Sequence, residues 1–134
     1  MTAATLADAD EFERQARKLA DDAWLAGTWE DRMHAEDRAE ELREDARNIR
    51  ARIKSSIEHI RDYYGLDLWV GLTVKHEGRP GVIVGFAGQY VTVQLEGDDH
   101  PATCHATASM EYPPGTRVGP NPDERFAHLV QTAA

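Results

Sequence analysis

Apolar residues in the first half of the chain recur every three or four positions, which is the spacing of one face of an α-helix. A first helix is expected from Thr5 to a turn at Gly27, with a short apolar stripe made of Phe12, Ala16, Leu19 and Ala23. A second helix is expected to run to Tyr64, and its stripe has nine members: Ala35, Ala39, Leu42, Ala46, Ile49, Ile53, Ile57, Ile60 and Tyr64. Acidic residues and arginines fill the positions between, as on a solvated face. The pattern predicts an antiparallel helical hairpin of coiled-coil type.

The ends of both helices carry capping residues. Gly27 stands where a left-handed residue closes a helix, and Thr28 then suits the N-cap of the second helix. Thr5 and Asp8 are alternative caps for the first helix, since each is followed by an acidic residue three positions later. Gly65 ends the second helix.

The two helices differ in length, at about 20 and about 35 residues, or roughly 30 Å and roughly 52 Å. With the turn at Gly27, Phe12 falls opposite Leu42. The last apolar positions of the longer helix then have no partner on the shorter one: Ile53, Ile57, Ile60 and Tyr64. They need a cover, for which the following β domain, the C-terminal segment and a second chain are alternatives.

Two of these covers make opposite predictions about oligomeric state. In a monomer, Phe126, Leu129 and Val130 of a short C-terminal helix would fold back on the isoleucines. In an antiparallel homodimer, the second helix would pair with its copy across a two-fold axis. Acids gather early and bases late along this helix, so an antiparallel pair sets opposite charges against each other, which favours the dimer.

The hydrophobic period changes to two between residues 68 and 112, which is the spacing of β-strands. Val70, Leu72 and Val74 alternate with small or polar residues, and residues 90–95 alternate in the same way. Clusters of Gly, Pro and Asp separate these runs, and shorter extended pieces follow around residues 102–105 and 109–112. About five short strands in so few residues predict a small, strongly bent barrel.

Residues 71–74 (Gly-Leu-Thr-Val) and 78–83 (Gly-Arg-Pro-Gly-Val-Ile) resemble the opening hairpin of KOW and related SH3-like barrels of transcription and translation proteins. The resemblance implies a five-stranded SH3-like barrel over about residues 68–112. Nucleic-acid-binding members carry basic loops, whereas only Lys75 and Arg79 are basic here. A helical hairpin ahead of a β domain also resembles the Gre-type transcript-cleavage factors, with acids near the tip: Asp21, Asp22, Glu30 and Asp31.

The predicted fold class is therefore α+β. The expected organisation is a helical hairpin over residues 1–65, an SH3-like β-barrel over residues 66–115, and a tail with a short docked helix over residues 116–134. Asn121, Pro122 and Glu124 supply the start signals of that last helix.

Composition narrows the setting of the protein. The net charge is −9, which opposes phosphate binding, and arginine outnumbers lysine 12 to 3, as is typical of GC-rich bacterial or bacteriophage genomes. Cys104 is the only cysteine, so a reducing compartment is expected and the thiol is predicted to be buried and inert. The first 30 residues carry seven acids and no apolar run, which argues against a signal peptide. No apolar run has membrane-spanning length, and a cytoplasmic protein is expected.

Catalytic or cofactor chemistry finds little support. The only group with metal-ligand residue types is Asp98, Asp99, His100, Cys104 and His105. Strand alternation sends the last two to opposite faces, so no metal is expected. Neither a nucleophile motif nor a phosphate-binding glycine loop occurs, and we expect no enzyme and no cofactor.

Three sets of residues are candidates for binding. The barrel loops offer His76, Arg79, Phe86 and Tyr90. Trp24 and Trp29 flank the hairpin turn, where they form either an exposed docking tip or a staple for the turn. A basic strip on the second helix comprises Arg47, Arg50, Lys54 and Arg61. The expected function is a non-enzymatic adaptor that binds a protein through the barrel loops or the tip. The alternative is a nucleic-acid- or transcription-associated factor that uses the basic strip.

Overall fold

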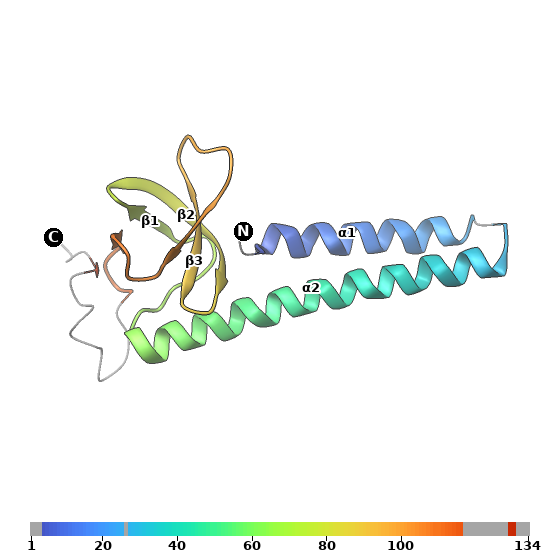
Figure 1. Ribbon diagram of the computed structural model, residues 1–134, viewed down its shortest axis with the longest axis horizontal. Helices are drawn as coiled ribbons and strands as arrows, with labels where there is room; N and C mark the ends of the chain where they lie inside the picture. Colours follow the sequence, from blue (N-terminus) through green and yellow to red (C-terminus); the bar gives the residue numbers. More distant parts are fainter. Residues whose placement is uncertain (1–3, 26, 117–128, 131–134) are drawn as a thin grey trace. The chain divides into compact units, whose positions relative to one another are not determined.

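The computed structural model describes residues 4–25, 27–116 and 129–130. Two helices, α1 (Leu6–Ala23) and α2 (Trp29–Tyr64), precede a curled antiparallel sheet of five strands, so the α+β class is confirmed (Figure 1). The chain forms two compact units. The hairpin unit is Leu6–Ala51, and the sheet unit contains the residues up to Thr5 and those from Arg52 onward. The unit boundary thus falls within α2, and not at the predicted end of the hairpin at residue 65.

Alanines form the seam of the hairpin unit, in which α1 and α2 run antiparallel (Figure 1). They are spaced seven residues apart on each helix, and each is at most 4% exposed: Ala9, Ala16 and Ala23 on α1, Ala39 and Ala46 on α2. Phe12 and Leu19 pack on Ala16, Ala39 and Leu42, which confirms the predicted register. Side chains this small allow the two backbones to approach closely.

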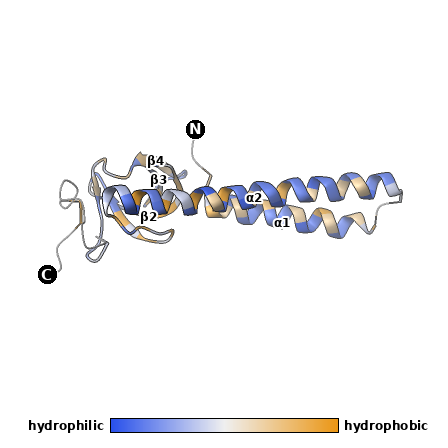
Figure 2. Cartoon of the chain, turned by 90° about the horizontal axis from the view of Figure 1, so that it is seen from below, coloured by the Kyte–Doolittle hydropathy of each residue, from blue (hydrophilic) through white to orange (hydrophobic). Residues whose placement is uncertain are grey.

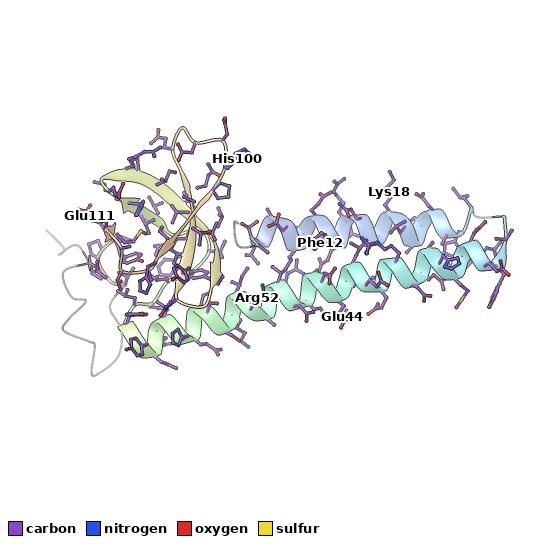
Figure 3. All side chains as sticks on the ribbon, in the orientation of Figure 1. Phe12, Lys18, Glu44, Arg52, His100 and Glu111 are labelled. Atoms are coloured by element: carbon purple, nitrogen blue, oxygen red, sulfur yellow. The ribbon has the colours of Figure 1, made fainter. Side chains whose placement is uncertain are left out.

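The outward surfaces of both helices are predominantly hydrophilic (Figure 2). Lys18 of α1 and Glu44 of α2 point away from the opposite helix, whereas Phe12 lies between the two helices (Figure 3). The stripe predicted from the sequence is therefore the buried face of the hairpin.

The helix ends follow the capping signals with one exception. Thr28 Oγ1 accepts a hydrogen bond of 3.1 Å from the backbone N–H of Asp31, which confirms the N-cap of α2. Gly65 is left-handed with φ 68° and ends α2 as predicted. Gly27 does not close α1, so its predicted role is wrong. The reason is that α1 has already ended at Ala23, and the next two N–H groups close its last turn by bonding to carbonyls three residues back.

The five strands are β1 (Thr73–His76), β2 (Arg79–Ala87), β3 (Tyr90–Leu95), β4 (Ala102–His105) and β5 (Met110–Glu111), arranged in the order β4-β3-β2-β1-β5 with every pair antiparallel. Glu77 and Gly78 both have positive φ and form a two-residue turn between β1 and β2. Regular pairing begins at Thr73 and not at Val70, because Gly71 adopts φ 101° just before the strand.

Large side chains fill the core of the sheet unit. The fully buried members of greatest volume are Tyr112, Phe86, Ile60, Leu66, Leu68 and Ile83. A β-bulge lies between Ile83 and Gly85, and Thr5 bridges to Gly85 at that point. The backbone of Thr5 lies so close that a Cβ on Gly85 would stand 3.2 Å from its Cα, which explains a glycine at this position.

The last apolar positions of α2 are covered within the same chain. Ile53, Ile60 and Tyr64 are buried in the sheet unit, and Ile57 is half-buried. Ser56 Oγ accepts a 2.8 Å hydrogen bond from the Gly88 N–H in the β2–β3 turn, which ties this part of α2 to the sheet. The premise of the helix-two dimer, an uncovered row of isoleucines, therefore does not hold.

The predicted C-terminal helix lies for the most part outside the described residues, Phe126 included. Leu129 is buried, and its carbonyl accepts a 2.7 Å hydrogen bond from the N–H of Tyr112. Leu129 and Val130 therefore lie beside the segment that follows β5.

Candidate protein-binding surfaces

The end of the hairpin exposes four large apolar side chains: Trp24 at 83%, Leu25 at 85%, Trp29 at 72% and Met33 at 38%. We call these four residues the tip cluster. Trp24 and Leu25 follow the last residue of α1, Trp29 begins α2, and Met33 lies one turn later on the same side of α2 as Trp29. A staple would bury both indoles, so exposures above two thirds favour the docking tip. Leu25 and Met33 were missed in the sequence because they match no helical stripe.

Four carboxylates surround the tip cluster and are exposed: Asp21, Asp22, Glu30 and Asp31. No lysine or arginine occurs between Asp21 and Asp31. Within the described part of the chain, none of these four carboxylates forms an ion pair, whereas acids further along α2 do so, such as Glu40 and Glu41. The tip is therefore an apolar surface bordered by four exposed carboxylates. The nearest bases in the sequence are Arg17, Lys18 and Arg32, and Asp21 lines a groove with Arg17 and Arg43.

A second apolar surface lies on the outer face of the sheet. Trp69 is 48% exposed and Val82 39% exposed. Trp69 borders a groove of about 410 Å³ that also contacts Leu72 and Pro80. A neighbouring groove contains Val82, and the two share Thr73 and Pro80. Strand alternation could have predicted the exposure of Trp69, because successive side chains of an extended segment point to opposite faces and the preceding Leu68 is buried.

The four loop residues do not meet at one end of the sheet. His76 pairs with Arg79 beside the β1–β2 turn, whereas Phe86 and Tyr90 lie at the opposite end of the nine-residue β2. Phe86 is 1% exposed, so its side chain belongs to the core and is not available to a partner. Their expected convergence at one loop-rich end is therefore wrong, because the nine-residue β2 separates the turn beside His76 and Arg79 from the turn beside Phe86 and Tyr90.

Arg79 already has an acceptor within the chain. Its guanidinium donates to the Asp98 carboxylate at 2.7 Å and to the Glu96 carbonyl at 3.2 Å, and the Asp98 bond raises the Arg79 pKa. The pair links the start of β2 to the turn after β3. An incoming ligand would have to compete with Asp98 for this guanidinium.

A histidine-centred cluster connects α2 to the sheet. His105 Nδ1 accepts the Thr107 N–H at 3.1 Å, so in the neutral ring the proton resides on Nε2, which faces the Tyr64 hydroxyl at 3.3 Å. That hydroxyl donates to Gln89 Oε1 at 3.1 Å, and the Tyr90 ring stacks edge-on against His105 at 5.5 Å. Every member of the cluster is engaged with another, so it acts as a structural joint.

Two members of the basic strip are engaged in the hairpin. Arg47 bonds to Glu40 at 2.8 Å, and this hydrogen bond is the largest cause of the lowered pKa of Glu40. Arg50 donates hydrogen bonds to Glu13 and, at 2.6 Å, to Asp10, both on α1. These bonds raise the pKa of Arg50, and the bond to Glu13 is the largest cause. Lys54 and Arg61 are exposed. The strip is thus partly neutralised by acids of its own hairpin.

Cys104 and the acidic residues near it form no metal site. Among the residues that the structure describes, no group of three or more His, Cys, Asp or Glu side chains is placed to hold an ion. Cys104 is half-buried with its Sγ 3.9 Å from Met110 Sδ, and burial raises the pKa of its thiol, which disfavours the reactive thiolate.

None of the described helices has both the length and the apolar composition needed to cross a membrane. In comparisons with known proteins, no family model, curated protein or solved structure matches the chain. The candidate surfaces are therefore assessed on their geometry and chemistry alone.

Proposed function

We propose that this chain is a non-enzymatic adaptor that binds another protein through the tip cluster at the end of its helical hairpin. The observation that carries the proposal is the exposure of Trp24, Leu25 and Trp29 on one short stretch. Scattered single apolar residues are normal on protein surfaces, whereas adjoining ones mark interaction sites. Tryptophan is also the residue type most enriched among those that dominate binding energies.

The tip cluster is poorly explained by folding. Ala23 is the last buried residue of α1, and the next buried residue on α2 is Ala39, so the four side chains lie beyond the packed seam. Burying a large apolar side chain contributes about 1.5–3 kcal/mol. A hairpin that leaves four such groups in water forgoes this stabilisation, and a partner surface would recover it.

For the sheet unit, we propose an SH3-like barrel. The strand order β4-β3-β2-β1-β5, the antiparallel pairing and the bulge in β2 support this assignment. A contribution of the loops to binding has weaker support, since Phe86 is buried and Arg79 is paired with Asp98.

Nucleic-acid binding through the basic strip is the weaker alternative. Arg47 and Arg50 are held by acids of the hairpin, and the chain carries a net charge of −9. Both features oppose the counterion release that drives binding to a phosphate backbone.

The test replaces both tip indoles in the full-length protein, Trp24→Ala with Trp29→Ala. The partner is first captured by crosslinking from the native host and then purified, and its affinity is measured by titration calorimetry. Two residues that dominate an interface cost at least about 2 kcal/mol each, so we expect the dissociation constant to rise more than about 100-fold.

The matched control is Glu44→Ala, an exposed change on the same hairpin that points away from α1 (Figure 3). It should bind like the unaltered protein. Unchanged affinity of the double variant, with helix content preserved by circular dichroism, would contradict a role for the tip.

A further inference from the structure

Resting on the proposed function, we infer that the partner of the tip is a basic protein surface, in which arginine or lysine side chains surround an apolar pocket. The apolar part of the inference follows from the tip cluster itself. The charge of the partner follows from the four carboxylates around it, which have no base among them in the sequence and no ion pair in the described structure.

Helix stability accounts for only half of this acidic rim. Glu30 and Asp31 lie in the first turn of α2, where negative charge complements the helix dipole. Asp21 and Asp22 lie in the last turn of α1, which has no basic residue, so the same dipole opposes them. The helix dipole therefore does not account for these two acids, which lie shortly before Trp24.

The combination of exposed indoles and unpaired carboxylates suits arginine in particular. A guanidinium can lie flat over the face of an indole and at the same time bond to a carboxylate at the ring edge. In the sequence, Trp24 follows Asp22 by two positions and Trp29 directly precedes Glu30, so indoles and carboxylates belong to the same end of the hairpin.

The acidic rim disfavours the other occupants of an exposed apolar surface. Anionic lipid surfaces and nucleic acids would be repelled by four negative charges at the point of contact. A second copy of the chain would bring its own acidic rim against this one. A basic protein surface is the occupant for which both the apolar and the charged groups contribute.

The test uses two synthetic helical peptides with the same leucine face. One carries arginines on both flanks of that face, and the other carries citrulline, which keeps the shape and hydrogen-bonding but has no charge. Binding is followed by tryptophan fluorescence in a Trp69→Phe background, so that only Trp24 and Trp29 report. We expect the arginine peptide to bind at least about tenfold more tightly, with affinity falling as salt rises from about 50 to about 300 mM.

Neutralising the two acids at the end of α1, Asp21→Asn with Asp22→Asn, should weaken binding of the arginine peptide at least about threefold. This is the effect expected from the loss of two exposed charge contacts. The matched control neutralises two exposed acids away from the tip, Glu44→Gln with Asp45→Asn, and should leave the affinity unchanged.

The outcomes separate the inference from the proposed function. Equal binding of both peptides would overturn the basic partner while leaving a purely apolar docking tip. Failure of both peptides to bind, or tip fluorescence changes with anionic vesicles or with self-association of the protein, would also overturn the inference. In the Trp24→Ala with Trp29→Ala variant, which lacks both fluorescent reporters, binding of the arginine peptide is measured by titration calorimetry. Binding that survives in this variant would instead remove the proposed function.

Discussion

The hairpin unit and the sheet unit of this protein each have their own core, and the side chains of the two cores differ in size. The hairpin seam is built on alanines, and the core of the sheet unit contains Tyr112, Phe86 and Ile60. An alanine methyl buries little area, so the hairpin depends on close contact between two backbones. The sheet unit depends on the apolar area that large side chains remove from water. The hairpin unit is thus stabilised by the proximity of two backbones, and the sheet unit by the volume of its side chains.

This difference determines which substitutions each unit tolerates. A seam of small side chains has no room for added atoms, and a core of large side chains leaves a cavity when atoms are removed. The tip cluster belongs to the hairpin unit, whose core consists mainly of small side chains. The buried residues nearest to it in the sequence are Ala23 and Ala39, so the apolar side chains of the tip cluster lie outside that core.

The largest expected effect is loss of volume in the sheet unit. Phe86→Ala should lower the free energy of unfolding by about 3–5 kcal/mol, because Phe86 is fully buried and the bulged β2 backbone cannot collapse into the space. Chemical denaturation followed by fluorescence would measure this change. The control is Val82→Ala on the exposed face of the same strand, which should lower the free energy of unfolding by less than about 1 kcal/mol. Similar costs for both variants would contradict the assignment of Phe86 to the core.

Next in size is added volume in the hairpin seam. Ala39→Leu should destabilise the hairpin by about 1–3 kcal/mol, because Ala39 is completely buried between α2 and α1 and the larger side chain forces the helices apart. Ala7→Leu, on the exposed side of α1, should be nearly neutral. Helix content during thermal unfolding reports the change. A stabilised Ala39→Leu variant would show that the seam is loosely packed and would break the comparison.

The smallest expected effect is a difference in pH response between the units. In the sheet unit the buried Tyr112 hydroxyl donates to the Ala106 carbonyl at 2.5 Å, and burial raises the pKa of this phenol far above 10.0. The contribution of this phenol to the stability of the fold is present below pH 10.0, the ordinary pKa of tyrosine. It is lost as the pH rises above that value. Tyr112→Phe should cost about 1 kcal/mol at neutral pH and weaken this alkaline loss.

The hairpin should respond at the opposite end of the scale. Hydrogen bonds from Arg14 and Gln15 lower the pKa of Glu11, and those from Arg47 and Arg43 lower that of Glu40. Because folding lowers the pKa values of these two carboxyl groups, they stabilise the hairpin above pH 4.5, the ordinary pKa of glutamate. This stabilisation is lost as the pH falls below that value. Unfolding curves for both units from acid to alkaline pH would check this contrast. A Tyr112→Phe variant with the same alkaline limit as the unaltered protein would contradict the role given to the phenol.

Local patterns in the sequence were sufficient for most of the secondary structure. The three-four spacing predicted both helices and the register of Phe12 with Leu42, and Thr28 and Gly65 marked the ends of α2 correctly. Period-two alternation and the turn clusters predicted about five strands within residues 68–112. β1 starts later than expected, and the sequence of the nine-residue β2 does not alternate. These features depend on residues a few positions apart, whose geometry is set by the backbone itself.

For the candidate site, the sequence by itself determined where tryptophans and acids occur, and tertiary structure alone decided which of them face water. Phe86 and Tyr90 are both aromatic strand residues, yet one is buried and the other half exposed. The reason is that Phe86 pairs with the buried Val91, so Tyr90 points to the opposite face of the sheet. The cover over Ile60 was equally undecided, since the apolar stripe of the helix does not distinguish between the sheet, the C-terminal segment and a second chain. Ser56 and Gly88, 32 residues apart, settle it by a hydrogen bond that forms only in the folded chain. Periodicity reports which face of an element is apolar, but which surface covers that face depends on contacts distant in sequence, and these exist only after the chain has folded.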